Sequence, residues 1–228
     1  MSVFQSYLGS YVSLVRKDIV LEIRGKQFIV SSAAFGVLMV FIMGIALNAA
    51  SRIPVFWSSG LLWMAIFFTV SLGLNRRDDR DNEFDAWRGL WMAPLDRSLI
   101  YYAKWTSSSA LVFITESALT VAYFIILNQP FPPHFVYFVL VLIGGAIGLT
   151  GIATFVATLA TASSMRDLIV PLLLFPLTIP LFLALIHLTV MTLSAHQTMS
   201  LVWMDILIAY IVVFAVLPWL LYELLLEV

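Results

Sequence analysis

The sequence predicts an all-α integral membrane protein, in which residues 1–228 form a single domain of six transmembrane helices behind an amphipathic N-terminal helix. The first observation is composition, since 62% of the residues are hydrophobic and only 11% are charged, whereas about a quarter of a soluble domain is charged. The second is spacing, because the uncharged stretches are long enough to cross a hydrocarbon core of about 30 Å. Composition therefore excludes a soluble enzyme, and a net charge of −1 provides no field that attracts nucleic acid.

Residues 1–26 predict an amphipathic helix. Apolar side chains recur every three or four residues on one face, while serines and cations lie on the opposite side. Six charged residues also make this segment too polar for a cleaved signal peptide. We expect the helix to lie in the cytoplasmic leaflet, joined to the first span through Gly25, and the pattern leaves its functional role open. The apolar positions are Phe4, Leu8, Val12, Val15, Ile19 and Ile23.

Charge-free stretches and helix breakers divide the rest of the chain. Residues 27–51 and 53–75 carry no charge, and each suits one span. The stretch 117–165 is too long for one helix and is interrupted by the prolines of 130–133, since proline removes a donor and clashes with the preceding turn. Polar residues 194–197 interrupt the next run. The predicted helices are 28–50, 54–74, 102–127, 135–161, 168–190 and 202–224.

The distribution of positive charge orients these helices. Cytoplasmic segments of membrane proteins carry an excess of Lys and Arg. If the N-terminus is inside, eleven of the twelve Lys and Arg residues fall on inside segments, and only Arg52 falls outside. Six spans with both termini in the cytoplasm are therefore expected.

The segment 75–98, between the second and third spans, is the most polar part of the chain and holds six of its thirteen acidic residues. Within it Phe84, Trp87 and Trp91 recur at helical spacing, and Asp81 or Asn82 suits the start of a short helix. Aromatic residues on one side and carboxylates on the other suit insertion into a groove of a cytoplasmic protein. An interfacial helix whose tryptophans anchor at the lipid headgroups is an equal alternative.

Three features inside the predicted spans stand out. Glu116 falls in the middle of the third span, where a carboxylate costs roughly 2–4 kcal/mol or more unless it is paired or protonated. It suits either a gating or substrate-path residue or a hydrogen bond to Ser or Thr of another helix, and the second is favoured. Gly144 and Gly148 form a small-xxx-small pair suited to close helix packing. The fifth span carries Pro171, Pro176 and Pro180, which predict a bent and flexible element.

Several kinds of site are missing from the sequence. It has no cysteine, so disulfides, cysteine-ligated metals and C-x-x-C-H haem attachment are excluded. It has no Walker A, H-E-x-x-H or catalytic-triad pattern. His134, His187 and His196 are scattered over the outer side and favour plain interfacial residues over ligands to haem iron. We expect no catalytic residue and no metal or cofactor bound directly.

Two stretches of the sequence resemble a known family. The architecture of six spans with an amphipathic lead-in resembles the permease of ABC exporters of the ABC-2 type. The stretch 89–98, followed by Tyr101 and Lys104, and the stretch from Gly151 through the proline-rich 166–180 look like CcmB, the haem exporter protein B family of cytochrome c maturation. The similarity runs from about residue 12 to the end. The segment 84–89 departs from the acidic pattern expected there, which affects the individual ATPase contacts.

The resemblance implies a non-catalytic permease subunit in the bacterial inner membrane. Two copies would pair with two copies of the ATPase CcmA and associate with CcmC and CcmD. ATP hydrolysis on CcmA would drive haem export or release of the haem-loaded chaperone CcmE, with haem as the cargo. The segment 75–98 would be the coupling loop, and its candidate ATPase-coupling residues are Asp81, Glu83, Phe84, Asp85, Trp87, Arg88 and Trp91.

Two other functions are compatible with the sequence. One keeps the ABC-2 architecture and exports a lipid, a glycan or a drug. The other is a scaffold that holds a haem-handling complex together without transport. A secondary transporter is disfavoured, because Glu116 alone offers an intramembrane group suited to proton coupling.

Overall fold

The computed structural model describes residues 3–47, 53–83, 97–160, 166–194 and 200–225, and this part of the chain is helical with no strand. Six of the helices contain apolar windows long enough to cross a membrane, from Ile29–Ala46 to Leu201–Leu220. The predicted all-α membrane protein is therefore confirmed. The helices are α1 Val3–Gly25, α2 Gln27–Ala46, α3 Val55–Glu83, α5 Arg97–Ile126, α6 Phe135–Ala160, α7 Arg166–Leu193 and α8 Leu201–Leu225.

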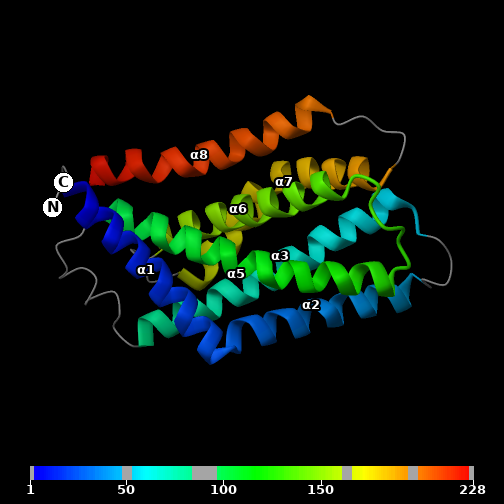
Figure 1. Cartoon of the computed structure of the whole chain (residues 1–228), viewed down its shortest axis with the longest axis horizontal. Helices are drawn as coiled ribbons and strands as arrows, with labels where there is room; N and C mark the ends of the chain where they lie inside the picture. The colour runs from blue at the N-terminus through cyan, green and yellow to red at the C-terminus, as the bar shows by residue number, and fades with distance from the viewer. Residues whose placement is uncertain (1–2, 48–52, 84–96, 161–165, 195–199, 226–228) are drawn as a thin grey trace.

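The six long apolar helices run side by side, and α1 crosses one end of the bundle obliquely (Figure 1). The start of α1, the end of α3, the start of α5 and the end of α8 all lie at that end. The surface around the bundle is apolar, as Leu38, Phe175 and Val212 are each more than half exposed. Such a surface suits contact with lipid acyl chains.

The largest difference from the predicted boundaries is in α3. The sequence predicts a span that ends near residue 74, whereas α3 continues to Glu83. Asp81 and Asn82 therefore lie inside α3, and their expected role at the start of a new helix is wrong. Opposite charges four residues apart, such as Arg77 and Asp81, favour continuation of a helix into water.

The joint between α1 and α2 also differs from the prediction. Gly25 belongs to α1, and the break falls at Lys26, whose φ is 53°. The Lys26 amide donates to the Glu22 carbonyl at 2.7 Å, so α1 hydrogen bonding continues up to this residue, and the Lys26 carbonyl accepts from the Val30 amide at 2.9 Å. The direction of the chain thus changes at one left-handed residue that is not glycine.

Helix α6 lies at the centre of the packing, and its glycines receive side chains from four other helices. A Cβ on Gly144 would lie 2.8 Å from Leu207 of α8, and one on Gly148 would lie 3.1 Å from Leu181 of α7. Gly145 faces the ring of Trp63 from α3, and Gly151 faces Trp105 from α5. Small residues on α6 therefore allow the close approach of its neighbours.

Candidate functional site

The structure describes only part of the predicted coupling loop. Phe84, Asp85, Trp87, Arg88 and Trp91 lie outside the described residues. Asp81 and Glu83 lie in the last turns of α3, about eleven residues beyond the apolar window Val55–Leu72. At 1.5 Å per residue, this extension carries α3 about 16 Å past the window. The acidic end of α3 thus projects from the apolar part of the bundle, at the end where α5 begins (Figure 1).

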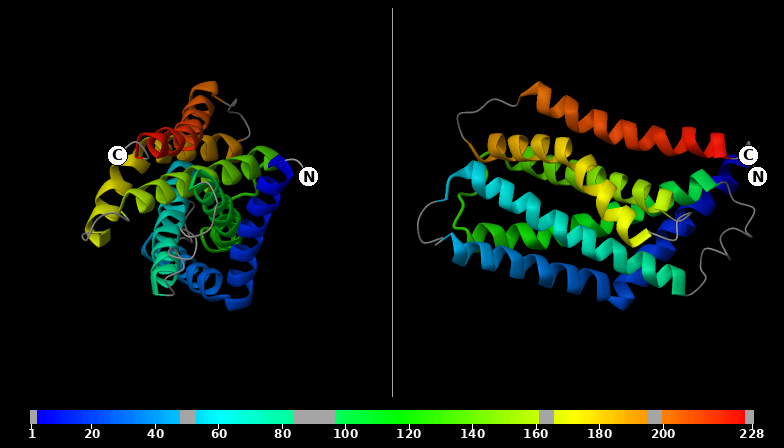
Figure 2. Two further views of the ribbon diagram at one scale, coloured as in Figure 1. Left: turned by 90° about the vertical axis from the view of Figure 1, so that its left-hand side faces the viewer. Right: turned by 180° about the vertical axis from the view of Figure 1, so that it is seen from behind.

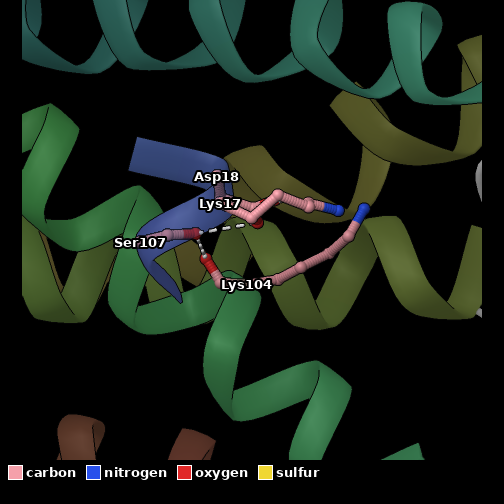
Figure 3. A network of polar contacts seen from close by, with 4 residues as sticks. All are labelled: Lys17, Asp18, Lys104 and Ser107. Carbon is pink, nitrogen blue, oxygen red and sulfur yellow. Dashed lines mark hydrogen bonds and ion pairs between the residues drawn. The ribbon is translucent and has the colours of Figure 1, made fainter. Parts of the chain in front are cut away.

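The first turns of α5 follow this loop in sequence and bind the N-terminal helix. The Tyr11 hydroxyl of α1 lies 2.6 Å from Thr106 Oγ1. Thr106 donates its own proton to the Tyr102 carbonyl at 2.8 Å, so Tyr11 is the donor. The Ser107 hydroxyl lies 3.3 Å from the Asp18 carboxylate, which also pairs with Lys17 at 3.4 Å (Figure 3). Helix α1 is thereby fixed to α5 by polar contacts.

These contacts leave part of the apolar face of α1 exposed. Leu8 and Val12 are 56% and 54% exposed, and Ile23 is 49% exposed. The side of α1 that contacts the protein is instead a third strip of Tyr11, Asp18 and the buried Glu22, which the sequence analysis did not single out. A helix that is held by the strip of Tyr11, Asp18 and Glu22, with apolar side chains exposed beside it, suits the surface of a leaflet.

Glu116 is buried between α3 and α5, with 2% of the side chain exposed. It shares a narrow crevice with Ile66, Thr69, Val70 and Thr115. Neither carboxyl oxygen has a hydrogen-bond partner among the described residues. The favoured prediction of a hydrogen bond to Ser or Thr on another helix is therefore wrong. Thr69 donates to the Ala65 carbonyl at 2.7 Å, so its proton is already engaged within α3.

Other polar groups near Glu116 are also without partners. The hydroxyls of Thr120 on α5 and Ser32 on α2 are buried and have no hydrogen-bond partner within the described part of the chain. One turn beyond Ser32, a Cβ on Gly36 would lie 2.7 Å from the Thr69 hydroxyl. Gly36 therefore brings α2 close to α3 and α5 at this level, and sequence reasoning missed it because its partners are far away in the chain.

The prolines of the fifth span do not interrupt it. Pro171, Pro176 and Pro180 all lie within the continuous helix α7. The side chains of Pro176 and Pro180 are exposed. Figure 2 shows that the first turns of α7 leave the direction of its later turns. Loss of the amide donors at prolines accounts for such a bend.

The aromatic residues at the opposite end of the bundle surround one histidine. His187 of α7 stacks on Trp203 of α8, with ring centroids 4.1 Å apart and planes 6° apart. Phe56 of α3 approaches the same imidazole edge-on at 5.8 Å. Among the described residues, no three His, Asp or Glu side chains gather in a way that suits a metal ion. His196 lies outside the described residues.

The comparison with protein families decides the identity. The sequence profile of the family described as CcmB protein matches residues 10–221, which is most of the chain. The chain belongs to the CcmB family. Members of this family are the membrane component of the haem-export ABC transporter of cytochrome c maturation, and they are permease subunits without catalysis of their own. Comparison with curated proteins and with solved structures gives no significant match.

Proposed function

We propose that this chain couples ATP hydrolysis by a CcmA ATPase to haem export or to the release of haem-loaded CcmE. The observation that carries the proposal is the extension of α3 to Glu83, well beyond its apolar window Val55–Leu72, at the end of the bundle where α5 begins. Family membership implies an ATPase partner for the transporter. In this proposal the ATPase contacts the last turns of α3, which extend beyond the apolar window of this helix and carry acidic residues in the sequence.

The location of this bundle end follows from charge. In the sequence, eleven of the twelve Lys and Arg residues fall on the same side of the predicted spans as both ends of the chain. The excess of positive charge on cytoplasmic segments supports an orientation with both termini in the cytoplasm. The membrane is then the bacterial inner membrane, and the segment 75–98 faces the ATPase.

The partners and the cargo follow from the same assignment. CcmA carries the ATP, and this chain binds no cofactor of its own. A second copy of the chain, CcmC, CcmD and the chaperone CcmE complete the assembly, with haem as the cargo and membrane lipid around the bundle. No nucleic acid takes part, since a net charge of −1 supplies no attraction for a polyanion.

Movement of the permease needs helices that repack between two arrangements. The bend in α7 gives one such element, with Pro171, Pro176 and Pro180 as hinge positions. The contact between α3 and α5 around Glu116 gives another, because this carboxyl has no hydrogen-bond partner among the described residues. Gly144 and Gly148 of α6 then act as the close-packed axis against which the other helices move.

The proposed function is tested by a single substitution in the coupling loop. Trp87→Asp is expected to abolish stimulation of the ATPase in the reconstituted complex while membrane insertion is unchanged. The matched control is Trp57→Asp, because Trp57 is 67% exposed in the first turn of α3, at the other end of the bundle. An unchanged ATPase rate in the Trp87 variant contradicts the assignment of the loop.

A further inference from the structure

Helix α8 contains a proline whose missing amide leaves a backbone carbonyl without its usual donor. Pro218 lies inside α8 and is buried. In an α-helix its amide would donate to the carbonyl of Phe214, four residues earlier, and proline cannot do so. A carbonyl without a donor is costly in a membrane, because the hydrocarbon core holds no water to replace the donor. Another part of the protein is therefore expected to supply the donor.

Two adjacent tyrosines of α5 supply donors at this point. The Tyr101 hydroxyl lies 3.2 Å from the Phe214 carbonyl and 3.4 Å from the Gly151 carbonyl of α6. The Tyr102 hydroxyl donates to the next carbonyl of α8, that of Ala215, at 2.6 Å. The pair thus satisfies the region of α8 that Pro218 disturbs.

A neighbouring tryptophan holds the tyrosines in place. Trp105 packs against both rings, with centroids 6.2 Å and 6.3 Å away. Its indole Nε1 donates to the Ile147 carbonyl of α6 at 2.9 Å. Gly151 lets the indole approach α6 closely, because a Cβ there would lie 3.2 Å from the ring. The side chains of 101–105 thus join α5 to α6 and α8 at one level.

The position of these residues in the chain suggests their role. Tyr101 is the fifth residue of α5 and lies directly after the loop assigned to the ATPase. Helix α8 is a peripheral helix, with 17% of its apolar window buried. A displacement of α5 therefore reaches α8 through the hydroxyls of Tyr101 and Tyr102, since hydrogen bonds fix direction as well as distance.

We propose that Tyr101 and Tyr102 are positioning residues that transmit movement of the ATPase-coupling loop to α8 through the carbonyls of Phe214, which lacks the amide donor of Pro218, and of Ala215. This inference rests on the proposed function, because it assumes that the loop moves with the ATPase. It adds the path by which that movement leaves α5. Pro218 leaves the Phe214 carbonyl without its helical donor, and the two tyrosine hydroxyls bind this carbonyl and the next one, that of Ala215.

The test removes the two tyrosine hydroxyls, first in the presence of Pro218 and then together with Pro218→Ala, and measures ATPase activity, chaperone release and stability. In the complex with its ATPase, Tyr101→Phe together with Tyr102→Phe is expected to retain ATPase activity within about twofold while chaperone release falls at least fivefold. Amide hydrogen exchange of residues 214–222 is expected to change on nucleotide addition in the native complex and not in the variant. Tyr123→Phe is the matched control, because it removes another buried tyrosine hydrogen bond, that to Ser58 at 3.0 Å.

Adding Pro218→Ala to the double tyrosine variant separates transmission from stability. Alanine restores the amide donor to Phe214, so this carbonyl no longer needs the Tyr101 hydroxyl. If the tyrosines transmit movement, the triple variant is more thermally stable than the double tyrosine variant but does not regain chaperone release. Recovery of release in the triple variant overturns the proposal and leaves the tyrosines with a structural role. Native release in the double tyrosine variant overturns it too.

Failure of the proposed function has a different signature. If the native complex shows no ATPase stimulation that depends on Trp87, the assignment of the loop fails before the tyrosine variants are compared. If stimulation depends on Trp87 and the tyrosine variants behave like the Tyr123→Phe control, the transmission path fails alone.

Discussion

The polar side chains in the first turns of α5 have hydrogen-bond partners on other helices, whereas those in the middle of the same helix do not. In the first turns, Tyr101, Tyr102 and Trp105 each donate to a backbone carbonyl of another helix. One turn later, Ser109 lies 2.7 Å from Thr150 of α6. In the middle of the same helix, the carboxyl of Glu116 and the hydroxyl of Thr120 have no partner among the described residues.

A helix contact with paired polar groups is expected to be more stable than one with an unpaired carboxyl. Polar groups in a membrane interior are costly without partners, so paired groups hold helices in one arrangement. An unpaired carboxyl gives the α2, α3 and α5 contact less stability than a fully apolar or fully paired contact would have. The first turns of α5 are therefore its firmer contact, with α6 and α8, and the surroundings of Glu116 are its weaker one.

The largest expected effect comes from forcing α2 away from this contact. Gly36→Leu adds a side chain whose Cβ alone would lie 2.7 Å from the Thr69 hydroxyl. Overpacking of this kind costs about 1–3 kcal/mol or more. We expect loss of most folded protein in detergent, measured as the monodisperse fraction. Gly9→Leu is the control, because a Cβ at Gly9 meets nothing within 4 Å. Equal yields for the two variants would falsify the close approach of α2.

Removal of one donor from the paired region is expected to have the next largest effect. Trp105→Phe removes the indole hydrogen bond to the Ile147 carbonyl of α6, which contributes about 0.5–1.5 kcal/mol, and the smaller ring leaves unfilled volume beside Gly151, which adds to the loss. The measurement is the free energy of unfolding in detergent. Trp219→Phe serves as the control, since Trp219 is 52% exposed on α8. A Trp105 variant as stable as this control contradicts the account of the paired region.

A smaller effect is expected at the edge of the paired region. Tyr11→Phe removes the donor to Thr106, and one exposed hydrogen bond contributes about 0.5–1.5 kcal/mol. We expect faster amide exchange in α1 with unchanged exchange in α6. Ser13→Ala is the comparison variant on the same helix, where the side chain is exposed. Unchanged exchange in α1 would show that the helix is held by other contacts.

The smallest effect is expected from the substitution Glu116→Gln. The carboxyl has no counter-charge in its crevice, so we expect it to be neutral in this arrangement. Glu116→Gln keeps the shape of a neutral acid and is expected to change the free energy of unfolding by less than about 0.5 kcal/mol. Glu116→Lys, which adds a charge, is expected to reduce insertion strongly. A loss above about 2 kcal/mol in the Gln variant indicates an ionised carboxylate held by a cation.

The sequence was sufficient for the course of the chain through the membrane. The number of spans and the separate N-terminal helix follow from local hydrophobicity and from breaks in it, and the structure contains them. Local patterns failed at boundaries. The charged residues after 74 predicted a loop, yet α3 continues to Glu83. Opposite charges four residues apart stabilise a helix in water, which accounts for the continuation.

Which polar groups meet is a different matter, because it depends on helices that are far apart in sequence. Glu116 was recognisable as an intramembrane acid, but its lack of a partner depends on how α2 and α3 pack around it. Tyr101 was visible in the sequence only as part of a family pattern. Its link to the carbonyl of Phe214, 113 residues away, is a property of the assembled bundle. Hydrophobic length is fixed residue by residue along the chain, whereas pairing of donors and acceptors is fixed only when helices pack.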